Sequence, residues 1–210
     1  VLDFAAAHVF IATGARWRRD GLGRALRQAL PGLESLPILT PDDVMGGALA
    51  PSPVLLFDDD HYYMGSVLAE RLVAQGVEVV FVTPAADVAA WTHNTLEQHR
   101  IQRRLLELDV TIIASHSLMT VTSDGVIASC VYTGRPRVIA VASLLLVTSR
   151  EPEQALFRAL DRPDEELREA GIQTLLPIGD CLAPGTIAAA VYGGHRQARE
   201  FDAPAGSLFM

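Results

Sequence analysis

The sequence is poor in cysteine. Its 210 residues include only two, Cys130 and Cys181, which lie far apart along the chain. Neither has the spacing of a metal-binding pair, and no disulfide framework is implied. Free cysteines are typical of a reducing compartment, so we expect a cytoplasmic protein without structural disulfides.

Long apolar runs and an excess of positive charge are also missing. No apolar run reaches the roughly 18 residues that indicate a membrane-spanning helix, and no secretory signal is visible. The net charge of −8 argues against a surface for nucleic acid or anionic membrane. Some arginines do cluster locally, either as a solvated face or as a site for phosphate or an acidic partner: Arg16, Arg18, Arg19, Arg24 and Arg27.

Signatures of independent catalysis are absent as well. The sequence has no nucleophile elbow of the G-x-S-x-G type and no P-loop. Its six histidines are scattered, and none pairs at metal spacing with another ligand. The acidic run Asp58-Asp59-Asp60 could bind a metal, but an acidic turn that caps a helix is the favoured interpretation. We therefore predict neither catalytic nor metal-binding residues in this chain.

What the sequence does contain is the outline of a dinucleotide-binding βαβ unit. Half of the residues are hydrophobic, which is enough for one large domain or two small ones. Apolar runs at residues 54–57 and 77–82 predict two strands, and the segment between them predicts a helix that Gly76 ends. Four apolar residues define the predicted buried face of that helix: Val67, Leu68, Leu72 and Val73.

The first loop of this unit lacks the glycines that cradle a pyrophosphate. Counted back from Gly76, the three positions of the G-x-G-x-x-G fingerprint fall on Asp60, Tyr62 and Gly65, so only the third is glycine. The first two glycines normally allow a tight turn and a close approach to the phosphates. A carboxylate about 5 Å from a phosphate costs about 3 kcal/mol at an effective dielectric constant of about 20. The unit has therefore either lost its ligand or never bound a nucleotide.

The rest of the chain alternates predicted strands and helices, which favours an α/β fold with parallel strands. A capping pattern at Thr40, Pro41 and Asp43 predicts a short helix that ends near Gly46, and residues 15–37 are expected to be irregular. The other predicted elements are strands at residues 8–14, 110–114, 140–148 and 175–178, a hairpin of strands at 118–121 and 126–132, and helices at 91–108, 153–160, 164–170 and 186–201.

Three local signals follow one another along the chain: Ala12-Thr13-Gly14, the glycine-poor loop, and Gly179-Asp180 before the last predicted helix. Alone, Gly179-Asp180 is typical of an ordinary strand-to-helix turn with Asp180 as the N-cap. Together the signals resemble flavoprotein reductases in which a nicotinamide domain is inserted between two segments of a flavin domain. In that resemblance Asp180 would hydrogen-bond a ribose or ribityl hydroxyl.

A closer resemblance is carried by residues 12–21, 58–65, 91–97 and 178–192. These segments resemble the C-terminal third of the trimethylamine, dimethylamine and histamine dehydrogenase family of iron–sulfur flavoproteins. The resemblance implies two Rossmann-like, three-layer domains of the glutathione-reductase type, the first of them incomplete. Residues 1–50 and 172–210 would form parts of an FAD- or ADP-binding-like domain, and residues 51–171 an inserted NAD(P)-binding-like domain. We expect the chain to be a fragment of a longer polypeptide.

The same resemblance implies a function. The missing N-terminal part would be a TIM barrel with FMN and a [4Fe–4S] cluster, where an amine is oxidised before electrons pass to an electron-transferring flavoprotein. The present region would hold ADP, or the ADP part of FAD, without being catalytic itself, and NAD(P)H would not be used. A homodimer is expected, with no nucleic-acid or membrane partner. The implied cofactor-binding residues are Ala12, Thr13, Gly14, Gly179, Asp180, Thr186 and Ile187.

Two other functions remain open at this point. One is an NAD(P)H-dependent flavin oxidoreductase of the 2,4-dienoyl-CoA reductase type, which would use the inserted domain. Asp60 and Tyr62 argue against it, as does Thr83, because an acidic residue at that position would hold the ribose of NAD and an arginine would suit NADP. The other is a structural interaction module that binds no nucleotide.

Overall fold

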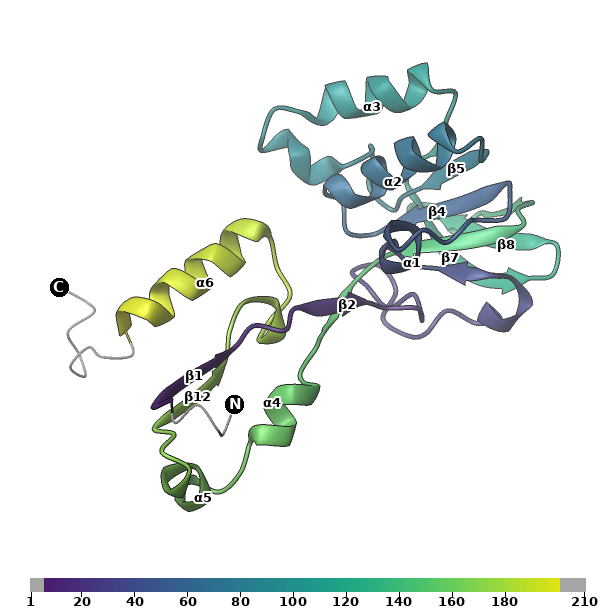
Figure 1. Ribbon diagram of the computed structural model, residues 1–210. Helices are drawn as coiled ribbons and strands as arrows, with labels where there is room; N and C mark the ends of the chain where they lie inside the picture. The colour runs from purple at the N-terminus through teal and green to yellow at the C-terminus, as the bar shows by residue number, and fades with distance from the viewer. Residues whose placement is uncertain (1–5, 201–210) are drawn as a thin grey trace. The chain divides into compact units, whose positions relative to one another are not determined.

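The computed structural model describes residues 6–200, which divide into two compact units. Within that range, unit 1 comprises residues 6–16 and 150–200, and unit 2 comprises residues 17–149. Figure 1 shows their helices and strands and labels many of them. No helix in the described range is long and apolar enough to cross a membrane.

Unit 2 is built on a five-stranded parallel sheet with the strand order β3-β10-β4-β5-β6. Every residue of the three inner strands is buried. A parallel sheet that is covered on both faces needs strands that are apolar throughout, which is why continuous apolar runs predicted them correctly. The strands are β3 (Ile38–Leu39), β10 (Ser143–Val147), β4 (Val54–Asp58), β5 (Val79–Val82) and β6 (Thr111–Ile113).

Different layers cover the two faces of this sheet (Figure 1). One face packs against the helices α1 (Pro41–Met45), α2 (Tyr63–Ala74) and α3 (Gln98–Glu107). The other packs against an antiparallel sheet of β7 (His116–Thr122), β8 (Gly125–Cys130) and β9 (Pro136–Ile139). The side chains of β4 contribute alternately to the two cores, because successive side chains of a strand point to opposite faces. Val54 and Leu56 belong to the core on the helical side, and Leu55 and Phe57 belong to the core on the other side.

The predicted βαβ unit is present as β4, α2 and β5, with Val54 in register with Val79. Leu68 and Leu72 are fully buried under α2, and Val73 packs partly against the same core. The prediction was wrong for Val67, which is 49% exposed. The buried stripe runs through Leu68, Ala69 and Leu72, so Val67 lies beside it.

The predicted helix at residues 91–108 is interrupted. A short 3-10 helix, η3 (Ala90–His93), is followed by a turn, and only then does α3 begin. Leu96 has a left-handed φ of 60° and is 83% exposed. A non-glycine residue in that conformation breaks an α-helix, so Leu96 ends the predicted helix instead of forming part of it.

The predicted hairpin is confirmed by the antiparallel pairing of β7 with β8 across the turn Ser123-Asp124, in which Thr122 lies opposite Gly125. Its third strand, β9, was not predicted. β9 begins at Pro136, and its first three residues are exposed. Proline and polarity are typical of an edge strand, and they weaken the apolar pattern on which a prediction depends.

The capping pattern before α1 is also confirmed. The Thr40 backbone N–H donates a hydrogen bond to the Asp43 carboxylate at 2.7 Å, and Gly46 ends the helix. The preceding segment is mostly irregular, as expected, apart from β2 (Ala15–Trp17) and the 3-10 helix η2 (Leu33–Ser35).

Unit 1 pairs β1 (His8–Ile11) with β12 (Thr174–Pro177) as parallel strands. Its helices are α4 (Ala155–Leu160), α5 (Asp164–Glu169), the 3-10 helix η4 (Gly179–Cys181) and α6 (Ile187–Glu200). Strand β11 (Arg150–Pro152) forms a two-stranded sheet with β2. None of the described residues of α6 is buried. The predicted end of this helix at Phe201 lies outside the described residues.

The boundaries of the compact units differ from those of the predicted domains. The prediction placed residues 1–50 and 172–210 in one domain and residues 51–171 in the other. Residues 17–50 belong to unit 2, where β3 and α1 complete the parallel sheet and its helical layer. Residues 150–171 belong to unit 1.

Candidate functional site

Two of the predicted turns lie side by side in unit 1. Strands β1 and β12 run parallel, with Ile11 opposite Pro177, and the Ile178 backbone N–H donates to the Ile11 carbonyl oxygen at 2.9 Å. Parallel strands end at the same edge of a sheet. The segment 12–14 and the turn 179–180 therefore leave that edge as neighbours, although Gly14 and Gly179 are 165 positions apart in the sequence.

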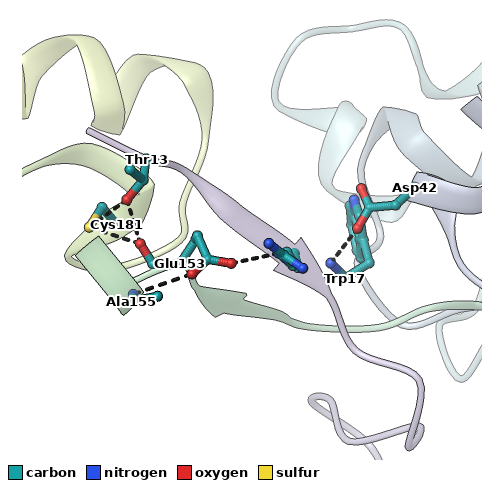
Figure 2. Close-up of polar contacts among 7 residues, drawn as sticks. Thr13, Trp17, Asp42, Glu153, Ala155 and Cys181 are labelled. Carbon is teal, nitrogen blue, oxygen red and sulfur yellow. Dashed lines mark hydrogen bonds and ion pairs between the residues drawn. The ribbon is translucent and has the colours of Figure 1, made fainter. Parts of the chain in front are cut away.

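A buried thiol links these turns to a third segment. The Thr13 hydroxyl donates to the carbonyl oxygen of Glu153 and lies 3.3 Å from the sulfur of Cys181. The Cys181 thiol in turn lies 3.3 Å from the Glu153 carbonyl oxygen, and Cys181 is fully buried. Figure 2 shows the three side by side. Neither Cys181 nor Glu153 was among the predicted site residues, because nothing in their local sequence indicates a contact across the unit.

The two glycines are required by the backbone. Gly14 has a φ of 82° and Gly179 a φ of 57°, both in the left-handed region that favours glycine. The Gly14 carbonyl accepts the Glu153 backbone N–H at 2.9 Å. Among residues 6–200, and apart from its two chain neighbours, no atom lies within 4 Å of the position that a Gly14 side chain would take, so this turn leaves open space beside its backbone.

Asp180 is held by two groups of unit 1. One carboxylate oxygen accepts the guanidinium of Arg150 at 2.6 Å, and the other accepts the Gly185 backbone N–H at 3.0 Å. Arg150 also donates to the Gly185 carbonyl oxygen at 2.6 Å. Asp180 therefore anchors the loop that leads into α6, and Arg150 is a residue that sequence reasoning missed.

The N-terminus of α6 is capped by Thr186. Its hydroxyl accepts the Ala189 backbone N–H at 3.3 Å, and its carbonyl accepts that of Ala190 at 3.1 Å. Asp180 does not perform this capping. Thr186 is exposed, Ile187 is 85% exposed, and Ala12 and Thr13 are exposed on the first turn. All seven predicted residues thus belong to one edge of unit 1, and four of them face solvent within that unit.

The glycine-poor loop of unit 2 follows β4 at the carboxyl edge of its own sheet. Asp58 and Asp59 are both completely buried. Gly65, in the first turn of α2, lies so close to Asp58 that a side chain there would approach its carboxyl carbon to 2.8 Å. This close packing of helix on strand is the role of the third glycine in the fingerprint, so Gly65 retains its role although the first two glycines are gone.

Burial governs the chemistry of Asp58. Its removal from water raises its pKa to about 7, against the opposing influence of His61. One oxygen accepts the His61 backbone N–H at 3.1 Å. The other oxygen receives no hydrogen bond from residues 6–200. The carboxyl group is therefore neutral over much of the range below pH 7.

The arginine cluster forms no common anion site in the described chain. Arg18 pairs with Asp20, and Arg19 with Asp43. Arg16 pairs with Glu153 within unit 1 at 2.6 Å. The Arg24 guanidinium stacks 4.6 Å from the centre of the Trp91 ring. Residues 6–200 also contain no group of three or more potential metal ligands.

These features define a class of protein. The mixed α/β fold with a parallel sheet is related to that of FAD- and NAD-binding reductases: thioredoxin reductase from Lactococcus lactis matches with a TM-score of 0.61 and 20% identity over 92% of this chain and 64% of its own. At that identity the likeness concerns the fold alone. Residues 39–135 match the family model of the OYE-like second alpha/beta domain.

Closer relatives identify the family. Dimethylamine dehydrogenase from Hyphomicrobium sp. (strain x) is 31% identical over 96% of this chain and 30% of its own length. The solved structure of histamine dehydrogenase from Rhizobium sp. 4-9 has a TM-score of 0.94 and 41% identity over 100% of this chain and 33% of its own. The chain belongs to this amine dehydrogenase family of oxidoreductases. It spans about a third of the length of these relatives.

Proposed function

We propose that this chain is the nucleotide-binding region of an amine dehydrogenase, and that unit 1 binds ADP or the ADP part of FAD. The observation that carries the proposal is the meeting of the segment 12–14, the turn 179–180 and the N-terminus of α6 at one edge of unit 1. In open α/β sheets, ligands bind beyond the carboxyl ends of the strands, and helix N-termini attract phosphate.

The residues at this edge fit such a ligand. Gly14 offers backbone next to open space, and α6 presents the positive end of its dipole. The Asp180 carboxylate already accepts two hydrogen bonds but has further lone pairs for a hydroxyl group. We assign the contacts to Ala12, Thr13, Gly14, Gly179, Asp180, Thr186 and Ile187.

For the whole protein we propose two Rossmann-like domains, the first of which is completed by polypeptide beyond this chain. The exposed apolar side chains of α6, Ile187, Val191 and Tyr192, support this completion. The parent enzyme would oxidise an amine of the dimethylamine, trimethylamine or histamine type. FMN and a [4Fe–4S] cluster would lie in its remaining part, an electron-transferring flavoprotein would accept the electrons, and two copies would form a dimer. The support for these points is membership of the family.

The nucleotide is tested on the intact protein. Acid precipitation followed by chromatography of the supernatant should release one adenine nucleotide per chain, and we expect ADP. Recovery of no adenine nucleotide would contradict the proposal.

A matched pair of variants tests its location. Gly14 and Gly171 share a left-handed φ, of 82° and 78°, and have open space around the position of a side chain. Gly14→Ala and Gly171→Ala should therefore strain the backbone alike, by about 1 kcal/mol. Only Gly14→Ala should reduce the nucleotide content of the purified protein. Equal nucleotide content in the two variants would place the ligand elsewhere.

A further inference from the structure

Unit 2 has the strand order at which dinucleotides bind in open α/β sheets, and part of the chain itself lies at that point. In the order β3-β10-β4-β5-β6, the chain runs from β4 outward to β5 and β6, whereas β10 lies on the other side of β4. The switch point is thus between β4 and β10, and ligands of open α/β sheets bind at the carboxyl ends of the strands there. The Asp59 backbone N–H donates to the Val147 carbonyl oxygen at 2.9 Å, which places Asp59 at this point.

The segment 22–25, which we call the strap, contacts the switch point through Asp59. The buried Asp59 carboxylate accepts the Ala25 backbone N–H at 2.8 Å. A side chain at Gly23 would overlap that carboxylate and approach the Cβ of Thr148 to 3.2 Å. In a dinucleotide site, glycine backbone approaches the anionic pyrophosphate. Here glycine backbone approaches an anion that the chain supplies itself.

Two further contacts, at Leu22 and at Arg24, hold the strap in place. The Ser149 hydroxyl, just beyond β10, donates to the Leu22 carbonyl oxygen at 2.6 Å. Arg24 stacks on Trp91, whose backbone N–H donates to the His61 carbonyl oxygen at 2.9 Å. The strap is therefore attached to the residues that follow β10 and to the loop that follows β4, which flank the switch point.

We propose that the strap is a built-in occupant of the dinucleotide crevice of unit 2, and that Asp59 is the group that holds it there. The crevice is closed to a nicotinamide dinucleotide by the chain's own backbone, in addition to the replacement of the first two fingerprint glycines. Unit 2 then serves as a permanently closed structural domain.

Hydrogen–deuterium exchange of the intact protein, followed by mass spectrometry, tests the proposal. In the wild type, peptides that contain residues 21–26 should exchange slowly. Asp59→Ala removes the acceptor of the Ala25 N–H and should speed this exchange at least about tenfold, since hydrogen bonds to charged groups are among the strong ones. Gln28→Ala, at an exposed position three residues beyond the strap, is the matched control and should leave the exchange of residues 21–26 unchanged.

Gly23→Ala is a second test that does not remove a buried charge. Its side chain should expel the strap and give the same faster exchange, while peptides that cover β4 and β5 stay protected. Exchange of residues 21–26 that is equally slow in the wild type and both variants would overturn the role of Asp59.

Addition of NADH at about 1 mM tests whether the crevice is closed to a dinucleotide. It should change exchange neither in residues 21–26 nor in residues 58–65 of the wild type. Slower exchange there on addition of NADH would show an accessible crevice and overturn the proposal. The ADP content of the same samples, measured after acid extraction, reports separately on unit 1, so failure of the strap proposal and failure of the ADP proposal are distinguishable.

Discussion

At the scale of single residues, the carboxyl group of Asp58 makes the stability of unit 2 depend on pH. It follows a strand that is buried on both faces, and the third fingerprint glycine brings α2 directly against it. Water is excluded from the group, so the charged form is disfavoured and the pKa rises to about 7. In an unfolded chain the ordinary value is 3.8.

The stability of unit 2 should therefore fall as the pH rises towards neutrality. Because the folded state binds the proton more tightly, the stabilisation from Asp58 is complete below about pH 4 and is lost as the pH rises through about 7. The largest possible difference is about 4 kcal/mol. Asp58→Asn keeps a neutral group of similar shape, so it should raise the melting temperature more at pH 8 than at pH 5, and change it little only near pH 4.

Thermal unfolding between pH 5 and pH 8 measures this effect. Asp124→Asn, in the exposed hairpin turn, is the control and should keep the pH dependence of the wild type. If Asp58→Asn also keeps it, Asp58 is not the group responsible.

The residues of the candidate site could be predicted only in part. The turns at Gly14 and Gly179 carry local signals, because their glycines are required by a left-handed backbone. Arg150 and Cys181 carry none. Their roles come from contacts with Asp180 and Thr13, 30 and 168 positions away, and only the folded arrangement of β1, β11 and β12 brings those groups together.

At the scale of elements, the sequence predicted best where burial is uniform. Strands β4, β5 and β10 are apolar throughout because both faces of their sheet are covered. Prediction failed where a single backbone conformation decides the outcome. Leu96 resembles one more apolar residue on a helix, but its left-handed φ separates η3 from α3. A short edge strand such as β9, which begins at proline, has too little pattern to predict.

The packing of α2 on β4 gives a prediction at this scale. A methyl group at Gly65 would approach the Asp58 carboxyl carbon to 2.8 Å, so Gly65→Ala should force the helix away from the strand. We expect a loss of about 1–3 kcal/mol, the usual cost of overpacking. Val67→Ala, at a half-exposed position of the same helix, should change the stability by less than about 1 kcal/mol.

Urea unfolding followed by tryptophan fluorescence measures this difference. The two tryptophans of the sequence, Trp17 and Trp91, both belong to unit 2, so the signal reports on that unit. Equal stability of Gly65→Ala and the wild type would mean that α2 can shift without cost.

At the scale of the whole molecule, the two units differ in how much core they contain. Unit 2 has two apolar cores, one on each face of its parallel sheet. The buried apolar residues of unit 1 in the described range are Ile11, Ile172 and Cys181. The resemblance predicted an inserted domain of residues 51–171, whereas the compact unit comprises residues 17–149. The limits of unit 2 depend on residues 17–50, where the sequence predicts α1 but reveals neither β3 nor the strap.

Two fragments test these limits directly. Residues 17–149 contain both cores of unit 2, and their ends are joined by the hydrogen bond from the Arg18 backbone N–H to the Ser149 carbonyl oxygen at 3.0 Å. This fragment should fold alone and unfold in one cooperative transition.

Residues 51–171, the limits suggested by the sequence, lack β3, α1 and the strap, so the carboxylate of Asp59 loses its Ala25 donor. Loss of this hydrogen bond and of the core residues Leu39 and Val44 is destabilising, and this fragment should melt at a lower temperature or aggregate. Circular dichroism during heating compares the two. A fragment 51–171 as stable as 17–149 would show that residues 17–50 are an accessory and not part of the folding unit.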